Sequence, residues 1–250
     1  MDSPIKIVNE HLKFPKVNLK EPLQEGFILI SAEVDKRTSF WGESKSKKNL
    51  IKQLKELSGA LRKDKQVQDA TLFKASLFPP GRGGAYLQRL NKEVHDRYDV
   101  VLLIETISAD DIEEVQNNAI YQSILSAISQ YSSYHFVYSA ENIRRIDRVN
   151  HQKQGVFLFN YFVADNKSQN LKIWEYTAGW FQDQTQLDNS TLFSAIDDTP
   201  SDYRVINHCR WDGFMDILPS LIFKKSFKTY VLDNFEANHV AAIPILYKLA

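Results

Sequence analysis

The stretch of residues 203–211 constrains the fold of this chain more than any other part of the sequence. Its letters, YRVINHCRW, have the pattern of a strand, and they continue through a short polar junction into a long amphipathic helix pattern. Residues 98–106, YDVVLLIET, have the same character in the first half of the chain and also lead into a helix pattern. This repeated passage from strand to helix predicts that the chain contains two copies of one folding unit.

Each copy has the predicted order β-α-β-β-α-β, read from apolar runs of strand length and from apolar side chains at helical spacing. In the first copy we expect strands at residues 26–34, 70–78, 98–107 and 133–138, and helices at 50–61 and 112–128. In the second copy we expect strands at residues 155–163, 190–196, 203–211 and 240–247, and helices at 171–181 and 218–231. The helix at 171–181 carries a bulky stripe that includes Trp174, which predicts that this face is buried.

The remaining segments set the predicted boundaries. Residues 1–25 contain three prolines and no clean periodicity, so we expect an irregular leader. Residues 140–154 are polar and form the expected linker between a first unit at 26–139 and a second unit at 155–250.

Charge and cysteine content exclude several classes of protein. Lys plus Arg and Asp plus Glu each number 31, so no excess charge favours nucleic acid or an acidic membrane surface as a partner. The single cysteine, Cys209, excludes an internal disulfide and a cysteine metal cluster. The first residues lack the apolar core of a signal peptide, and no run approaches the ~18 apolar residues of a membrane span. We therefore expect a cytoplasmic protein.

Two split βαβ units in tandem resemble the ferredoxin-like topology. Their size, and the strand at 203–211 that leads into a helix, resemble the dimeric α+β barrel superfamily. That group includes cofactor-free antibiotic-biosynthesis-type monooxygenases, stress-responsive barrel proteins and tandem haem-binding relatives of chlorite dismutase. The resemblance covers residues 26–249. It implies an α+β fold in which two tandem units pack sheet to sheet as a barrel within one chain, around a central cavity, with helices outside.

The strand at 203–211 supplies the first candidate site. Successive side chains of a strand point to opposite faces, and the face covered by helices should be the more apolar one. We therefore expect His208 and Arg210 to point into the barrel. His208 could act as a base there, and Arg210 could hold an anion. The alternative is a structural ion pair between Arg210 and Glu105, which has the equivalent register in the first unit.

Three further residues are candidates for the same cavity. Asn160 and Tyr161 interrupt an apolar strand, and one of the two must face inward. Asn160 could polarise a substrate carbonyl, or it could bond to the backbone at a bulge. Trp211 could line the pocket of a flat ligand, or it could pack in the core. Arg82, in the glycine-rich turn at 79–84, could bind an anion, although the turn lacks the Lys-Ser/Thr ending of a nucleotide loop.

The sequence predicts no metal site and leaves the cofactor open. His135, His151 and His239 are too far apart in the sequence to define a ligand set by spacing. The resemblance to haem-binding proteins would require one axial ligand, which His208 or His239 could supply.

Two functions of different classes follow. In the first, a cavity between the sheets binds a small molecule, with His208, Arg210 and Asn160 as catalytic residues and Glu105, Tyr161 and Trp211 as ligand-binding residues. The resemblance then implies a cofactor-independent oxidoreductase similar to the monooxygenases. In the second, the barrel is filled by side chains and the protein is a non-catalytic stress-response or structural protein. A small-molecule ligand and a second copy of the chain are the partners left open.

Overall fold

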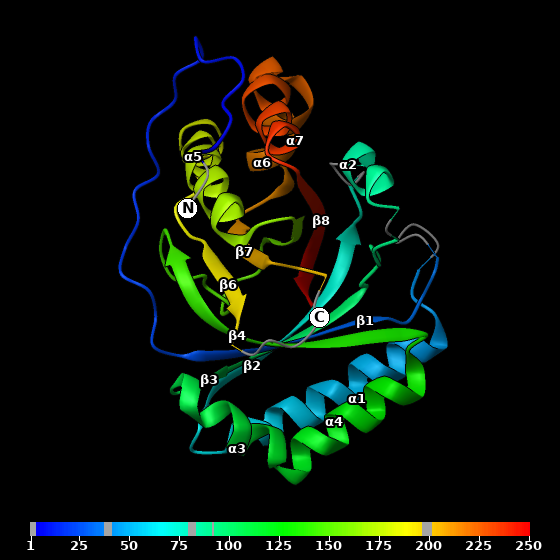
Figure 1. The fold of residues 1–250 in the computed structure, drawn as a ribbon. Coiled ribbons are helices and arrows are strands. Elements are labelled where there is room, and N and C mark those ends of the chain that lie inside the picture. Colours follow the sequence, from blue (N-terminus) through cyan, green and yellow to red (C-terminus); the bar gives the residue numbers. More distant parts are fainter. Residues whose placement is uncertain (1–3, 38–41, 80–83, 92, 197–201) are drawn as a thin grey trace.

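Eight antiparallel strands form a single closed barrel (Figure 1). The structure is a computed structural model, and it describes residues 4–37, 42–79, 84–91, 93–196 and 202–250. The order of hydrogen-bonded strands around the barrel is β1-β3-β2-β8-β5-β7-β6-β4. The strands are β1 (Gly26–Glu33), β2 (Val67–Leu77), β3 (Val100–Thr106), β4 (Tyr134–Arg145), β5 (Val156–Ala164), β6 (Thr191–Ala195), β7 (Val205–Trp211) and β8 (Val240–Leu249).

Helices cover the barrel on two opposite sides (Figure 1). One side carries α1 (Lys45–Leu61), η2 (Ala109–Asp111), α3 (Ile112–Asn117) and α4 (Ala119–Tyr131). The other side carries α5 (Lys167–Thr185), α6 (Phe214–Phe223), the π-helix η3 (Phe227–Leu232) and α7 (Asp233–Ala237), and a short helix, α2 (Gly84–Arg89), follows β2. Among the described residues, no helix is both long and apolar enough to cross a membrane.

Each half of the chain contributes four neighbouring strands, in the orders β4-β1-β3-β2 and β8-β5-β7-β6. The two sheets are joined at their edges, where β2 pairs with β8 and β4 pairs with β6. The predicted element order is therefore found, and the fold class is α+β. The edge pairing explains why residues 140–145 are not a linker, because β4 continues to Arg145 in order to pair with β6.

Aromatic side chains fill the inside of the barrel. Alternate residues of every strand face one shared core. It contains Phe73, Phe157, Phe159, Tyr161 and Tyr247, each of which is 0% exposed. The tyrosine hydroxyls in this core are hydrogen-bonded; Tyr247 donates to the carbonyl of Tyr98, at 2.7 Å. The resemblance implied a central cavity, but in this chain rings occupy the centre of the barrel.

The leader packs against the second half of the chain. Between residues 4 and 25 it is irregular, and it runs along the outside of α5 (Figure 1). Its apolar side chains, such as Phe14 and Val17, pack against the core beneath α5. Gly179 permits this close approach, because a Cβ atom at that position would lie 1.9 Å from the carbonyl oxygen of Pro15.

Trp174 tests the packing of α5. Its side chain is 5% exposed and contacts the core between α5 and the barrel. We expect Trp174→Ala to lower the free energy of unfolding by about 3–5 kcal/mol, because the ring leaves a cavity that the surrounding structure fills only partly. A urea melt measures this change. Ile107→Ala is the control, since Ile107 is 54% exposed, and a Trp174→Ala effect as small as that of the control would contradict the packing.

Candidate functional site

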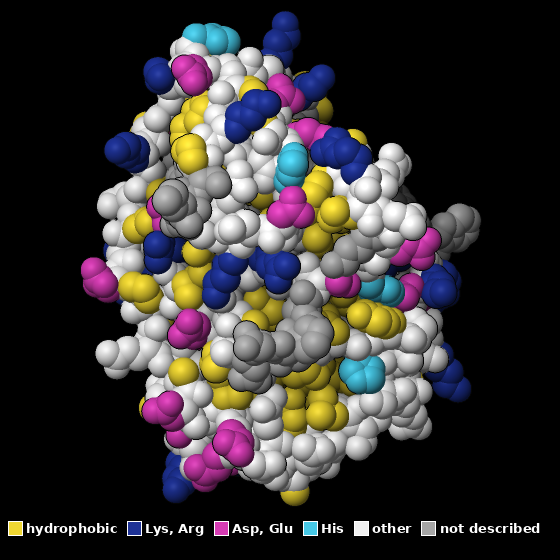
Figure 2. Space-filling view, in the orientation of Figure 1, with side chains coloured by type: hydrophobic (Ala, Val, Ile, Leu, Met, Phe, Trp, Pro, Cys, Tyr) yellow, Lys and Arg dark blue, Asp and Glu magenta, His cyan; other side chains and the backbone are white. Residues whose placement is uncertain are grey.

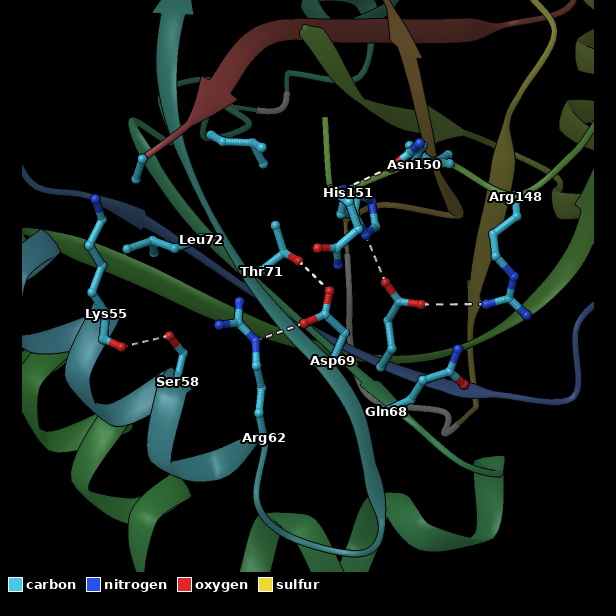
Figure 3. Close-up of a pocket in the computed structure, with 15 residues that line it drawn as sticks. Lys55, Ser58, Arg62, Gln68, Asp69, Thr71, Leu72, Arg148, Asn150 and His151 are labelled. Carbon is cyan, nitrogen blue, oxygen red and sulfur yellow. Dashed lines mark hydrogen bonds and ion pairs between the residues drawn. The ribbon is translucent and has the colours of Figure 1, made fainter. Parts of the chain in front are cut away.

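A polar cleft of about 1070 Å³ lies at the mouth of the barrel (Figure 3). Asp69 at the start of β2 and Glu105 at the end of β3 project into it. Arg148 and His151 reach it from the connection between β4 and β5, and Arg62 reaches it from the C-terminal cap of α1. The cleft is thus built from both halves of the chain.

Two carboxylates face each other at this mouth. Asp69 and Glu105 are direct partners in the β2–β3 ladder, next to a bulge in β2. Like charges in such a pair repel each other, so nearby cations and donors are needed. Arg62 Nε lies 2.8 Å from Asp69 Oδ1, and the Thr71 hydroxyl donates to Asp69 Oδ2 at 2.8 Å. Burial acts to raise the pKa of Asp69, but the hydrogen bonds from Thr71, Ala70 and Arg62 outweigh it and lower this pKa below its usual range.

Glu105 begins a chain of hydrogen bonds that leads from the cleft into the barrel. Its Oε1 lies 2.8 Å from His151 Nδ1. His151 Nε2 lies 2.9 Å from His208 Nε2, and His208 Nδ1 lies 3.0 Å from the carbonyl oxygen of Leu158. The side chains of Glu105 and His151 are 8% and 7% exposed, and His208 is 1% exposed.

The last hydrogen bond of this series, from His208 to Leu158, determines where the protons lie. The Leu158 carbonyl can only accept, so His208 Nδ1 carries a proton and donates it. Neutral His208 then has an acceptor at Nε2, and His151 Nε2 must donate to it. The remaining bond, between His151 Nδ1 and Glu105 Oε1, therefore holds one proton shared between imidazole and carboxyl. This proton lies next to the cleft, which both residues line.

The barrel core keeps His208 neutral. Its ring stacks on Phe159 with centroids 4.0 Å apart and meets the edge of Phe73 at 5.5 Å. Burial is the main reason that the pKa of His208 lies well below its usual value, and the charge of His151 lowers it further. Protonated His208 would also place an N–H opposite the N–H of His151, so the geometry opposes it.

Arg210 faces inward as predicted but does not pair with Glu105. Its guanidinium donates to the carbonyls of Gln154 at 2.6 Å and Lys153 at 3.2 Å, and it lies 2.8 Å from Asp212 Oδ1. The structural ion pair proposed between Arg210 and Glu105 is therefore wrong. The reason is the β4–β5 connection, whose carbonyls surround the guanidinium while its His151 takes the place beside Glu105. Arg210 holds that connection in position.

Among the other predicted residues, only Tyr161 joins the barrel interior. Its hydroxyl lies 3.1 Å from Ser31 Oγ and 3.5 Å from the Tyr247 hydroxyl, within the ring-filled core. Asn160 and Trp211 lie on the opposite strand face, which α5 covers. Each is adjacent in sequence to an inward-facing residue, Tyr161 or Arg210, and successive residues of a strand point to opposite faces. Trp211 Nε1 donates to Thr185 Oγ1 at 3.1 Å. The prediction that these two line the barrel cavity is wrong.

Neither of the two histidines considered as axial ligands, His208 and His239, is placed to bind a haem. Both ring nitrogens of His208 are engaged, and aromatic rings surround it on every side that a porphyrin would need. His239 lies at the surface, with its Nδ1 3.1 Å from Asp165 Oδ2. Neither His208 nor His239 is therefore available as an axial ligand for haem.

One group of side chains has donor atoms close enough for a metal ion. The ligand atoms of Asp69, Glu105 and His151 lie within 4.8 Å of one another. Both carboxylates already face guanidinium groups, since Arg148 Nη1 lies 3.8 Å from Glu105 Oε2 and Arg62 binds Asp69. A cation would have to compete with these guanidinium groups for the two carboxylates.

Sequence reasoning missed His151 and Asp69. His151 lies in the polar connection, where nothing in its sequence surroundings distinguishes it from a solvated residue, and Asp69 precedes the run predicted as a strand. The parity that placed Glu105 and His208 inward would have found Asp69 if β2 had been extended to Val67. Arg82 and most of its glycine-rich turn lie outside the described residues.

Comparisons with known proteins agree on the fold. Neither protein-family profiles nor curated proteins gave a match to the sequence. Among solved structures, an anthrone oxidase-like protein aligns with a TM-score of 0.63 at 8% identity, over 91% of this chain and 92% of that one. This chain has the dimeric α+β barrel fold.

Two further structures with this barrel fold extend the comparison. A candidate monooxygenase from Fusobacterium nucleatum aligns with a TM-score of 0.56 at 9% identity, over 90% of this chain and 92% of that one. A chlorite dismutase variant from Candidatus Nitrospira defluvii aligns with a TM-score of 0.53 at 7% identity, over 92% of this chain and 93% of that one. At such identities the likeness concerns the arrangement of the strands and helices.

The buried His208 predicts how stability depends on pH. A lowered pKa in the folded state means that the stability contributed by neutral His208 is complete above its unfolded pKa of about 6.5. That stability is lost as the pH falls from there toward the lowered folded-state pKa. We expect His208→Phe to reduce the loss of stability between about pH 7 and pH 5, measured by urea melts. The exposed His11 is the control, and a His208→Phe slope equal to those of the wild type and His11→Gln would contradict the burial argument.

Asn160 predicts a stabilising substitution. Its Oδ1 is buried without a hydrogen-bond partner among the described residues, beside a cavity of about 40 Å³ that Trp174 and Cys209 also line. We expect Asn160→Leu to raise the free energy of unfolding by about 1 kcal/mol, because an unsatisfied polar group is replaced by an apolar one. Its cross-strand partner Asn207 accepts from Ser190 Oγ at 2.6 Å, so Asn207→Leu should destabilise instead. Equal losses in both variants would show that Asn160 makes a needed polar bond.

Proposed function

We propose that this protein binds a small molecule with an acidic proton in the cleft at the barrel mouth and acts on it as an oxidoreductase. The observation that carries this proposal is the chain Glu105–His151–His208, which ends at the Leu158 carbonyl and leaves one movable proton beside the cleft. A base that a second residue orients, and that a third residue holds in one tautomer, is a recurring arrangement for proton abstraction.

The roles of the residues follow from their positions. Glu105 Oε2 is the carboxylate oxygen that does not bind His151, and it takes the proton from the substrate. The proton already between Glu105 and His151 shifts to the imidazole, whose orientation His208 maintains. Arg148, with Nη1 3.8 Å from Glu105 Oε2, then lies close to the anion formed on the substrate. Arg62 and Lys55 add positive charge along the same cleft.

The redox balance needs no bound cofactor. A methylene group next to a carbonyl or an aromatic ring becomes an electron-rich carbanion when Glu105 removes its proton. Molecular oxygen can accept those electrons, and R₂CH₂ plus O₂ gives R₂C=O plus H₂O, with oxygen as the only oxidant. The names of the structural neighbours, an anthrone oxidase-like protein and a candidate monooxygenase, support this class of reaction over others.

A second candidate function is a non-catalytic binding protein. The ring-filled barrel favours it, because the rings at the centre, Phe73, Phe157, Phe159, Tyr161 and Tyr247, are 0% exposed, whereas an active site in the middle of the barrel would need open space there. In that case the cleft binds an anionic ligand through Arg62, Arg148 and Lys55, and the Glu105–His151 pair is structural.

We also propose that residues 26–139 and 155–250 are two units derived by tandem duplication, joined by the segment that includes 146–154. The support is the shared strand order of the two halves and their reciprocal edge pairing. Glu105 and Arg210, which are the next-to-last residues of the third strand of each half, then occupy equivalent positions in the two units.

Oxygen uptake with anthrone as the probe tests the proposed reaction. We expect Glu105→Gln to lower kcat/KM about 100-fold, since a positioned base contributes on this order. Glu33→Gln is the matched control, because Glu33 is a buried carboxylate beside His95, 3.4 Å away, at the opposite end of β1. Equal uptake by Glu105→Gln and the control would contradict the role of Glu105. Binding of anthrone without uptake by the wild type would favour the second candidate.

A further inference from the structure

An apolar stripe on α6 is exposed to solvent. Met215, Ile222 and Phe223 are 79%, 66% and 78% exposed, the largest exposures among the big apolar side chains of the described residues. Met215 and Ile222 are about two turns, or ~10 Å, apart on the same face of the helix. The opposite face of α6 is buried through Ile217 and Ser220. An exposed apolar stripe next to polar groups is typical of an interaction surface.

The two ends of this stripe carry opposite charges. Beside Met215, Asp188 and Asp216 line a depression of about 530 Å³, together with Asp212, which is paired with Arg210 and Lys153. Beside Ile222 and Phe223, three lysines line a groove of about 620 Å³ together with Asp233 and Glu236. These lysines are Lys224, Lys225 and Lys228. The surface is therefore acidic at the start of α6, apolar in the middle and basic just after its end.

The basic end has cations that lack partners within the described part of the chain. No ion pair involves Lys225 or Lys228 there, whereas the neighbouring Glu236 faces Arg89 at 3.6 Å. The floor of the groove between these lysines is apolar and includes Leu221, Phe227 and Leu232. A ligand for this groove should thus combine an apolar side chain with flanking carboxylates.

The start of α6 has that combination, and we infer that the partner is a second copy of this chain. Two α6 helices that run antiparallel about a two-fold axis near Pro219 place Met215 of each copy over the groove of the other. The same operation brings Asp188 and Asp216 of one copy to Lys225 and Lys228 of the other, twice. A two-fold interface requires a surface that is complementary to itself, and opposite charges at the two ends of one helix provide it.

The charge distribution decides against a lipid surface. An anionic membrane attracts positively charged surfaces, and the carboxylates of Asp188 and Asp216 at one end of the stripe would be repelled. On the face shown in Figure 2, positive and negative side chains are interspersed. The second copy satisfies both ends of the stripe, and a membrane satisfies only one.

Charge reversal at each end tests the interface by sedimentation velocity over a range of protein concentrations. Lys225→Glu with Lys228→Glu makes both ends acidic, and Asp188→Lys with Asp216→Lys makes both ends basic. We expect each double variant alone to raise the dimer dissociation constant by at least ~10-fold. An equimolar mixture of the two should restore association, because each acidic end then meets a basic one.

Apolar substitutions supply an independent arm of the test. Phe223→Asp should abolish the dimer without loss of thermal stability in the monomer, since the side chain is 78% exposed. Ile107→Asp, at an exposed apolar residue elsewhere, should leave the dimer intact. Monomeric wild type at all concentrations would overturn the inference. So would a dimer that Phe223→Asp leaves unchanged, or variants whose mixture does not associate. Binding of the monomer to vesicles of anionic lipid, with no self-association, would assign the stripe to a membrane instead.

Discussion

The pairing of β2 with β8 and of β4 with β6 is the contact on which the rest of this structure depends. Each four-stranded sheet has two edges, and an unpaired edge exposes backbone donors and acceptors that seek a partner. Joining the edges of the two halves satisfies these groups within one chain. It also turns one face of every strand inward, so that the bulky rings from both halves share a single core. The helices then cover what remains of the outer faces.

That closure also creates the candidate site. The ladder between β2 and β3 sets Asp69 opposite Glu105, an arrangement that is unfavourable by itself. The connection from β4 to β5 crosses the same mouth because the first half ends and the second begins there. It brings His151 to Glu105 and to His208, which come from different halves of the chain. Gly155 lets this connection pass close to β7, since a Cβ atom there would lie 2.6 Å from Arg210 Nε.

The filled barrel and the polar cleft at its mouth together determine where the candidate site lies. A core of rings excludes water from His208 and fixes its tautomer, and this fixed tautomer determines the donor that His151 presents. The cleft outside stays polar and open, with arginines near each carboxylate. A proton is therefore held between Glu105 and His151, at the boundary between the buried core and the polar cleft.

Much of this arrangement could be predicted from the sequence, because it depends on local periodicity. Alternation along residues 203–211 correctly placed His208 and Arg210 inside the barrel, and the same parity placed Glu105 there. The order of strands and helices followed from runs of apolar residues and their spacing. These features depend on neighbours within a few positions in the chain, which a sequence records directly.

Only the tertiary structure determined which of these side chains contact one another. Asn160 and Trp211 lie on the helix-covered face, and Arg210 binds the backbone of a connection rather than Glu105. His151 is 46 residues beyond Glu105 and 57 before His208, and its ring meets both because the barrel closes. Contacts between such distant residues depend on how edges join and where a connection crosses, and no local pattern in the chain encodes that. The sequence by itself determined which side chains face inward; the closure of the barrel determined which of them meet.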